Sequence, residues 1–168
     1  MSRRRFAVVP IALLAVAVTL GSASAAAATP HAPPDDWVWP LAAFRIERPF
    51  EAPAHRYGAG HRGIDLRGDA ESDVRAPAAG TIAFSGVVAG RGVLTIDHGG
   101  GLVTTLEPVE SDLRAGTAVA GGEPVATVSL GGHAAPGALH FGVRLDGDYI
   151  NPLLLLDDVP RAVLLPCC

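Results

Sequence analysis

The segment Leu139-His140-Phe141-Gly142-Val143-Arg144-Leu145 decides the fold class, because its large apolar residues occupy every second position. Successive side chains on a β-strand point to opposite faces of the sheet. The pattern therefore predicts a strand with one apolar face in the core and with His140 on the other face.

Neighbouring segments show the same short alternation. Glycine-rich turns separate them, and no apolar pattern of helical period extends over a helix-length stretch. From Phe44 to Leu156 the sequence predicts an all-β domain, a small antiparallel sandwich or barrel-like fold. Its other strands are expected at 81–85, 93–97, 102–107 and 124–129.

The N-terminus has the layout of a secretory signal peptide. Arg3, Arg4 and Arg5 precede an apolar run over residues 6–20 and then small residues over 21–28. The run is shorter than the roughly 20 residues that a membrane-spanning helix needs. We therefore expect residues 1–25 to be removed after Ala25, with cleavage after Ala27 or an uncleaved anchor as alternatives.

The 168 residues are enough for one domain with tails. Residues 26–43 are expected to form a flexible lead, with Trp37 and Trp39 packed against the edge of the domain rather than stacked on a ligand. Residues 44–156 are expected to form the domain, and residues 157–168 a C-terminal tail. Cys167 and Cys168 lie in this tail, where adjacent cysteines bridge each other only through a strained ring. We expect an unstructured reactive tail, with disulfides between molecules after export as the alternative.

Charge excludes one class of partner. Residues 1–25 contain three arginines and no acids, so their removal changes the formal net charge from −4 to −7. A nucleic-acid partner is therefore not expected. Nor is a membrane partner expected after cleavage. The chain also lacks the phosphate loop of nucleotide enzymes and the Gly-x-Ser-x-Gly motif of serine hydrolases.

Three residues are candidate metal ligands. His61 and Asp65 are four residues apart, which puts them on one face of an extended chain, and His140 is on the polar face of its own strand. Two imidazoles and one carboxylate leave a fourth position open, the arrangement of a catalytic zinc site. Taken singly, each residue is as well explained by an ordinary solvated surface position.

Four motifs in order resemble the lysostaphin-type (LytM-domain) metallopeptidases of the bacterial cell wall. They are residues 60–66 (GHRGIDL), 74–82 (VRAPAAGTI), 96–99 (IDHG) and 139–144 (LHFGVR). The resemblance spans roughly residues 56–156 and implies the duplicated hybrid motif fold. It also implies a Zn²⁺ ion held by His61, Asp65 and His140, cleavage of peptidoglycan peptide cross-links, and a structural role for His98.

The chain departs from the family at two catalytic positions. The histidine that acts as a base in active members corresponds to Ala138, and the histidine that helps hold the oxyanion corresponds to Pro108. His133, in a glycine-rich loop, is the candidate replacement. Glu107 is expected to face away from the site if its strand continues through Pro108, and Glu110 lies beyond that proline.

Two functions follow from this pattern. The first is a secreted, cell-wall-associated zinc endopeptidase that hydrolyses peptide cross-links of peptidoglycan. The second is a catalytically deficient wall-binding or regulatory module that acts on a separate cell-wall hydrolase. Zinc content and hydrolysis separate these two functions from each other and from a purely structural role of the three residues.

Overall fold

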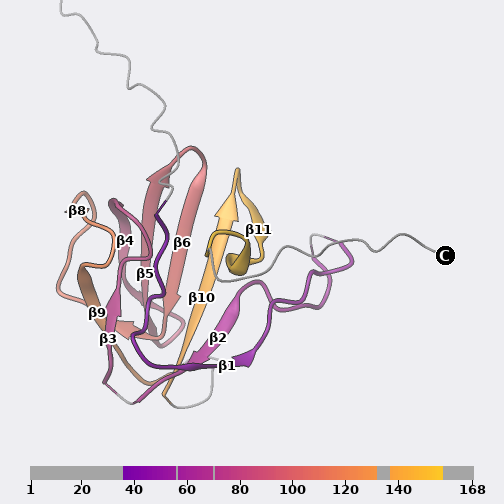
Figure 1. The fold of residues 1–168 in the computed structure, drawn as a ribbon, viewed down its shortest axis with the longest axis horizontal. Coiled ribbons are helices and arrows are strands. Elements are labelled where there is room, and N and C mark those ends of the chain that lie inside the picture. Colours follow the sequence, from indigo (N-terminus) through magenta and orange to yellow (C-terminus); the bar gives the residue numbers. More distant parts are fainter. Residues whose placement is uncertain (1–35, 56, 70, 132–136, 157–168) are drawn as a thin grey trace, which may run out of the picture.

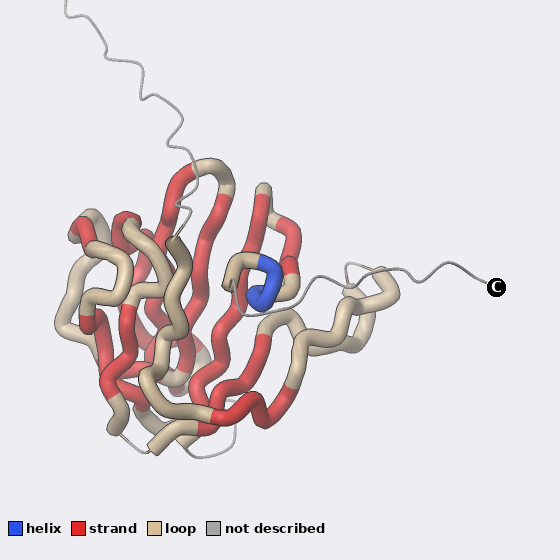
Figure 2. The backbone as a smooth tube through the Cα atoms, viewed as in Figure 1, coloured by secondary structure: helices blue, strands red, loops and turns tan. Residues whose placement is uncertain are grey.

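The computed structural model describes residues 36–55, 57–69, 71–131 and 137–156, and antiparallel β-sheets dominate them (Figures 1 and 2). The larger sheet has the strand order β1-β2-β10-β6-β5-β4-β8, and β11 pairs with β10. Its strands are β1 (Arg45–Arg48), β2 (Ile64–Arg67), β4 (Gly80–Val88), β5 (Arg91–Gly99), β6 (Leu102–Glu107), β8 (Ala118–Val119), β10 (Ala138–Leu145) and β11 (Asp148–Ile150). The predicted all-β class is confirmed.

A second, three-stranded sheet has the order β3-β9-β7. It contains β3 (Asp73–Arg75), β7 (Val109–Glu110) and β9 (Pro124–Val128). Its apolar side chains Val74, Val125 and Val128 join one core cluster with Ile96 and Leu106 of the larger sheet. The core therefore lies between the two sheets.

Strand β10 shows why the sequence alternates as it does. Leu139, Phe141 and Val143 are completely buried in the core, whereas His140 and Arg144 belong to the opposite face. Strands β2 and β6 flank β10 on its two sides. The larger sheet does not close into a barrel, since β1 and β8 end its path.

Packing begins before the Phe44 boundary expected from composition. Leu41 is only 1% exposed, and Trp37 and Trp39 pack against the core cluster. The amide of Val38 donates to Pro77 O at 2.7 Å, which ties this segment to the loop between β3 and β4. The prediction that both tryptophans pack against the domain is confirmed.

At the other end, Leu156 is buried after a short 3-10 helix, η1 (Pro152–Leu154). None of the described helices has the length and apolar character needed to cross a membrane. The signal peptide expected over 1–25, His133, and the tail with Cys167 and Cys168 all lie outside the described residues.

Candidate metal centre

His61, Asp65 and His140 meet at the start of β2. His61 forms an isolated bridge with Glu51 just before this strand, and Asp65 on β2 lies directly opposite His140 on β10. The three residues are 3%, 5% and 8% exposed. The structure thus brings His140 to the His61-Asp65 pair, from which it is far apart in the sequence, and nearly shields all three side chains from solvent.

Their ligand atoms converge on one point. His140 Nδ1 lies 2.8 Å from Asp65 Oδ1 and 3.2 Å from His61 Nε2, and His61 Nε2 lies 3.1 Å from the same carboxylate oxygen. Two imidazole nitrogens that face each other and one carboxylate oxygen form a donor set suited to a divalent metal ion.

A backbone contact fixes the orientation of His61. Its Nδ1 lies 2.7 Å from Pro49 O, and a carbonyl oxygen can only accept, so Nδ1 carries the proton and donates it. Nε2 of the neutral ring then keeps its lone pair for the point shared with Asp65 and His140. Metal-ligating histidines typically donate their other ring N–H in this way, so the residues fit a zinc ion.

Gly63 gives the His140 ring its space. A Cβ atom at this position would lie 2.7 Å from Nε2 of His140 and 2.6 Å from Phe141 O, and both distances are too short for real contacts. Glycine between His61 and Asp65 is therefore a steric requirement of the site, because any side chain would displace the imidazole.

Glu107 corrects an expectation from the sequence. Strand β6 ends at Glu107, and the chain then enters β7 in the other sheet, so the premise of a strand that continues through Pro108 is wrong. Glu107 lies directly opposite His140 across the β6–β10 pair. Directly opposite residues share a face of the sheet, so Glu107 belongs to the metal-site face. Its Oε2 lies 3.0 Å from Arg91 Nε, in a largely buried ion pair.

The structure shows what stands at the two positions where the sequence departs from the family pattern, Ala138 and Pro108. Ala138 is completely buried on β10, with the same orientation along the strand as His140, and its methyl group cannot accept a proton. Pro108 is also buried and has neither a side-chain donor nor an N–H group. Neither position supplies proton transfer or an oxyanion contact.

His98 has a structural environment, as expected. It is 1% exposed, its Nδ1 lies 2.9 Å from Ala79 O and its Nε2 lies 2.8 Å from Thr104 Oγ1. The Trp37 ring packs against it with the centroids 4.9 Å apart. Burial lowers the pKa of His98, and the hydrogen bond to Ala79 only partly opposes this shift.

Comparison with known proteins agrees with this geometry. Residues 59–152 match Peptidase family M23. Over 141 residues the chain is 35% identical to an uncharacterized protein of Mycobacterium tuberculosis, a match covering 80% of this chain and 57% of that protein. Over 126 residues it is 32% identical to the DD-carboxypeptidase/endopeptidase Mpg of Neisseria meningitidis, covering 73% of this chain and 29% of Mpg.

A solved structure of a zinc-containing peptidase from Vibrio cholerae has the same fold. Its TM-score is 0.60 at 20% identity, over 77% of this chain and 41% of that chain. The antiparallel sheets and the His-Asp-His centre define a domain of the metallopeptidase class. The chain belongs to Peptidase family M23, which confirms the resemblance to the LytM-type peptidases. It spans little more than half of the mycobacterial relative and under a third of Mpg.

Proposed function

We propose that the chain is a zinc-dependent peptidoglycan hydrolase that cleaves peptide cross-links. The observation that carries this proposal is the convergence of His61, Asp65 and His140 on one point in a chain of Peptidase family M23. Two similar proteins support it by their names, the DD-carboxypeptidase/endopeptidase Mpg and the zinc-containing peptidase of Vibrio cholerae.

The protein residues have separable roles in this proposal. His61 and His140 present ring nitrogens, and Asp65 adds the one negative charge of the donor set. When bound there, zinc supplies a Lewis acid and a water molecule of lowered pKa. Three protein ligands leave the remaining position for water or a peptide carbonyl.

Proton transfer has to come from outside the two usual positions, since Ala138 and Pro108 hold no titratable group. Among the described residues, two acids lie directly opposite His140 on the site face, Asp65 on β2 and Glu107 on β6. Asp65 is a candidate ligand, so Glu107 is the acid available for proton transfer. His133, proposed from the sequence as a catalytic residue, stays a prediction because it lies outside the described residues. Positioned proton transfer contributes about 10² to 10⁴ in rate.

The site of action proposed for the protein is outside the cytoplasm, at the cell wall. The signal-peptide pattern of residues 1–25 supports export. Peptidoglycan is also the substrate that the family implies, whereas the acidic net charge argues against a polyanion.

The test is release of peptide fragments from purified peptidoglycan by zinc-loaded residues 26–168, with bound zinc quantified in the same samples. His61→Ala removes one donor, and Arg114→Ala serves as the exposed control outside the site. We expect zinc-dependent release by the wild type and by Arg114→Ala, and none by His61→Ala. Stoichiometric zinc without any release would overturn hydrolysis and favour the wall-binding or regulatory module.

A further inference from the structure

A second site lies beside the metal centre. An open cleft of about 490 Å³ is lined by two arginines, two tyrosines, one histidine, one aspartate and small or apolar residues. Its walls belong to the segments that hold the metal ligands: Arg62 follows His61, and Arg144 is on β10 with His140. The cleft and the metal ligands therefore share the same two segments of the chain.

Arg144 is one of the two arginines that line this cleft. Its guanidinium carbon lies 5.9 Å from the centroid of the Tyr149 ring, which stands directly opposite it across the β10–β11 pair. The guanidinium group of Arg144 makes no hydrogen bond or ion pair with any other residue that the structure describes, and its buried Nε has no hydrogen-bond partner there. By contrast, the guanidinium groups of Arg67 and Arg91 are paired with Glu47 and Glu107.

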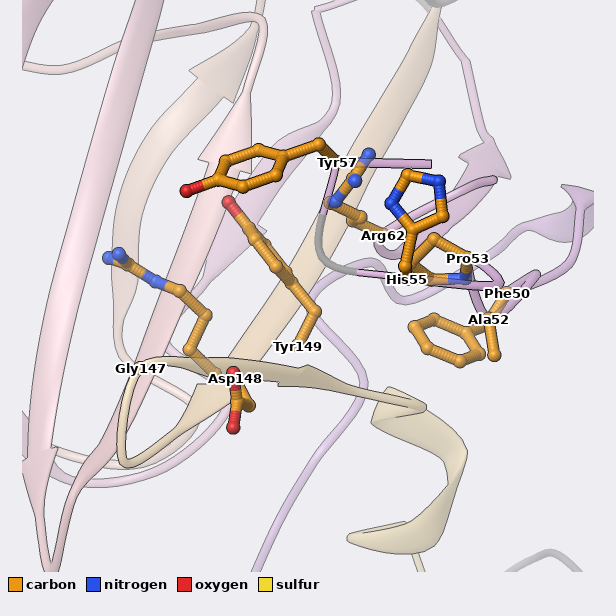
Figure 3. A pocket seen from close by; sticks show the side chains of 10 residues that line it. Phe50, Ala52, Pro53, His55, Tyr57, Arg62, Gly147, Asp148 and Tyr149 are labelled. Carbon is orange, nitrogen blue, oxygen red and sulfur yellow. The ribbon is translucent and has the colours of Figure 1, made fainter. Parts of the chain in front are cut away.

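The other polar groups of the cleft suit an anion. Figure 3 shows the hydroxyl groups of Tyr57 and Tyr149 close together at one end of the cleft, with Arg62 toward the other end, near His55. Arg62 Nη2 donates to Gly58 O at 3.0 Å, which anchors this second guanidinium. Asp148 is the one acid among the lining residues described, and in Figure 3 its side chain lies on the other side of β11 from Tyr149.

We infer that this cleft binds a carboxylate of the peptide substrate, with Arg144 as the main contact. Arginine presents a planar fork of donors that matches a carboxylate, and such charge-assisted bonds are stronger than neutral ones. The tyrosine hydroxyls add two neutral donors. This inference rests on the proposed peptidase function and adds a specificity to it: peptides with a carboxylate near the cleaved bond are preferred over neutral ones.

Three N-acetylated peptides test the inference. The first is tri-D-alanine with a free C-terminal acid, and the second is its C-terminal amide. In the third, also an amide, the last residue is D-glutamate. They differ only in whether a carboxylate is present and in whether it is terminal or on a side chain. Dissociation constants are measured by NMR titration of the zinc-loaded protein, in the wild type, Arg144→Gln and the distant, exposed control Arg114→Gln.

We expect the wild type and Arg114→Gln to bind at least one acidic peptide about tenfold more tightly than the neutral amide. Arg144→Gln should lose this difference while its amide spectrum and zinc content stay unchanged. Equal affinities of the wild type for all three peptides would overturn the carboxylate site and leave the proposed function intact. A preference that persists in Arg144→Gln would also overturn the assignment. No binding of any peptide to zinc-loaded protein would instead contradict the peptidase function.

Discussion

Glu107 and His140 face each other across the β6–β10 strand pair, so a carboxylate and a metal-ligand imidazole stand on the same face of the sheet. Glu107→Gln keeps the shape of the side chain and removes its charge. If this carboxylate takes part in proton transfer, kcat should fall about 100-fold with zinc content unchanged. Peptidoglycan hydrolysis rates and zinc stoichiometry, measured together, check this.

Glu110→Gln is the matched control, because Glu110 is exposed on β7. Loss of the Arg91 ion pair also lowers stability, so thermal unfolding of both variants is measured. A variant Glu107→Gln that is less stable but hydrolyses at the wild-type rate would restrict this residue to a structural role.

Asp65→Asn should weaken zinc binding, because it removes the only negative charge among the three candidate ligands. Zinc at a hundredfold excess over its Kd stabilises a folded protein by about 2.7 kcal/mol. We expect added zinc to raise the Tm of the wild type and of the exposed control Asp73→Asn, and a chelator to reverse the effect. Differential scanning calorimetry showing the same zinc-induced shift in Asp65→Asn would contradict the assigned site.

Gly63→Ala should damage the metal centre without any change in the ligands themselves. The added methyl group would overlap the His140 ring and Phe141 O, and overpacking of this kind costs about 1 to 3 kcal/mol. Zinc affinity and unfolding free energy should both fall. In the exposed control Gly121→Ala the new Cβ has no neighbour closer than 3.4 Å, so an equal effect in that variant would exclude the steric explanation.

Stability should depend on pH through His98. Because burial lowers its pKa in the folded state, the unfolded chain binds a proton that the folded chain does not. The free energy of unfolding therefore falls as the pH drops below the unfolded value of about 6.5, by at most about 1.4 kcal/mol per pH unit from this group. Urea unfolding between about pH 7.5 and pH 5.5 should give a flatter profile for His98→Gln than for the wild type. The exposed control His55→Gln should follow the wild type, and parallel profiles for all three chains would refute the assignment.

A chain that begins at Phe44 should be less stable than one that begins at Asp36. It lacks the buried Leu41 side chain and the contacts of Trp37 and Trp39 with the core. Burial of one large apolar side chain contributes about 1.5 to 3 kcal/mol, so the Tm should fall by several degrees. Calorimetry of the two chains decides this, and equal Tm values would show that the segment packs without stabilising the fold.

The sequence predicted β10 well, because strict alternation reports a strand with one buried face. It also indicated the grouping of His61, Asp65 and His140, although binding of zinc by them stays a prediction. The face of Glu107 could not be predicted, since it depends on where β6 ends and the chain changes sheet. The sequence also did not predict that the segment before Phe44 packs against the core, because its composition around Leu41 is rich in alanine and proline.

The pairing of Arg144 with Tyr149 likewise could not be predicted from the residues around either position. It arises only when the hairpin of β10 and β11 sets the register between the two strands. Composition could not reveal it either, because the chain as a whole is acidic.

Strand β10 carries both the metal ligand His140 and the cleft residue Arg144, so the distance between these two residues is fixed. From His140 to Arg144 an extended strand advances about 13 Å, at about 3.3 Å per residue. A substrate peptide that lies extended along β10 covers that interval with about four residues. The backbone of β10 thus fixes the spacing between His140 and Arg144. The protein can therefore distinguish substrates by the distance between their carboxylate and the cleaved bond.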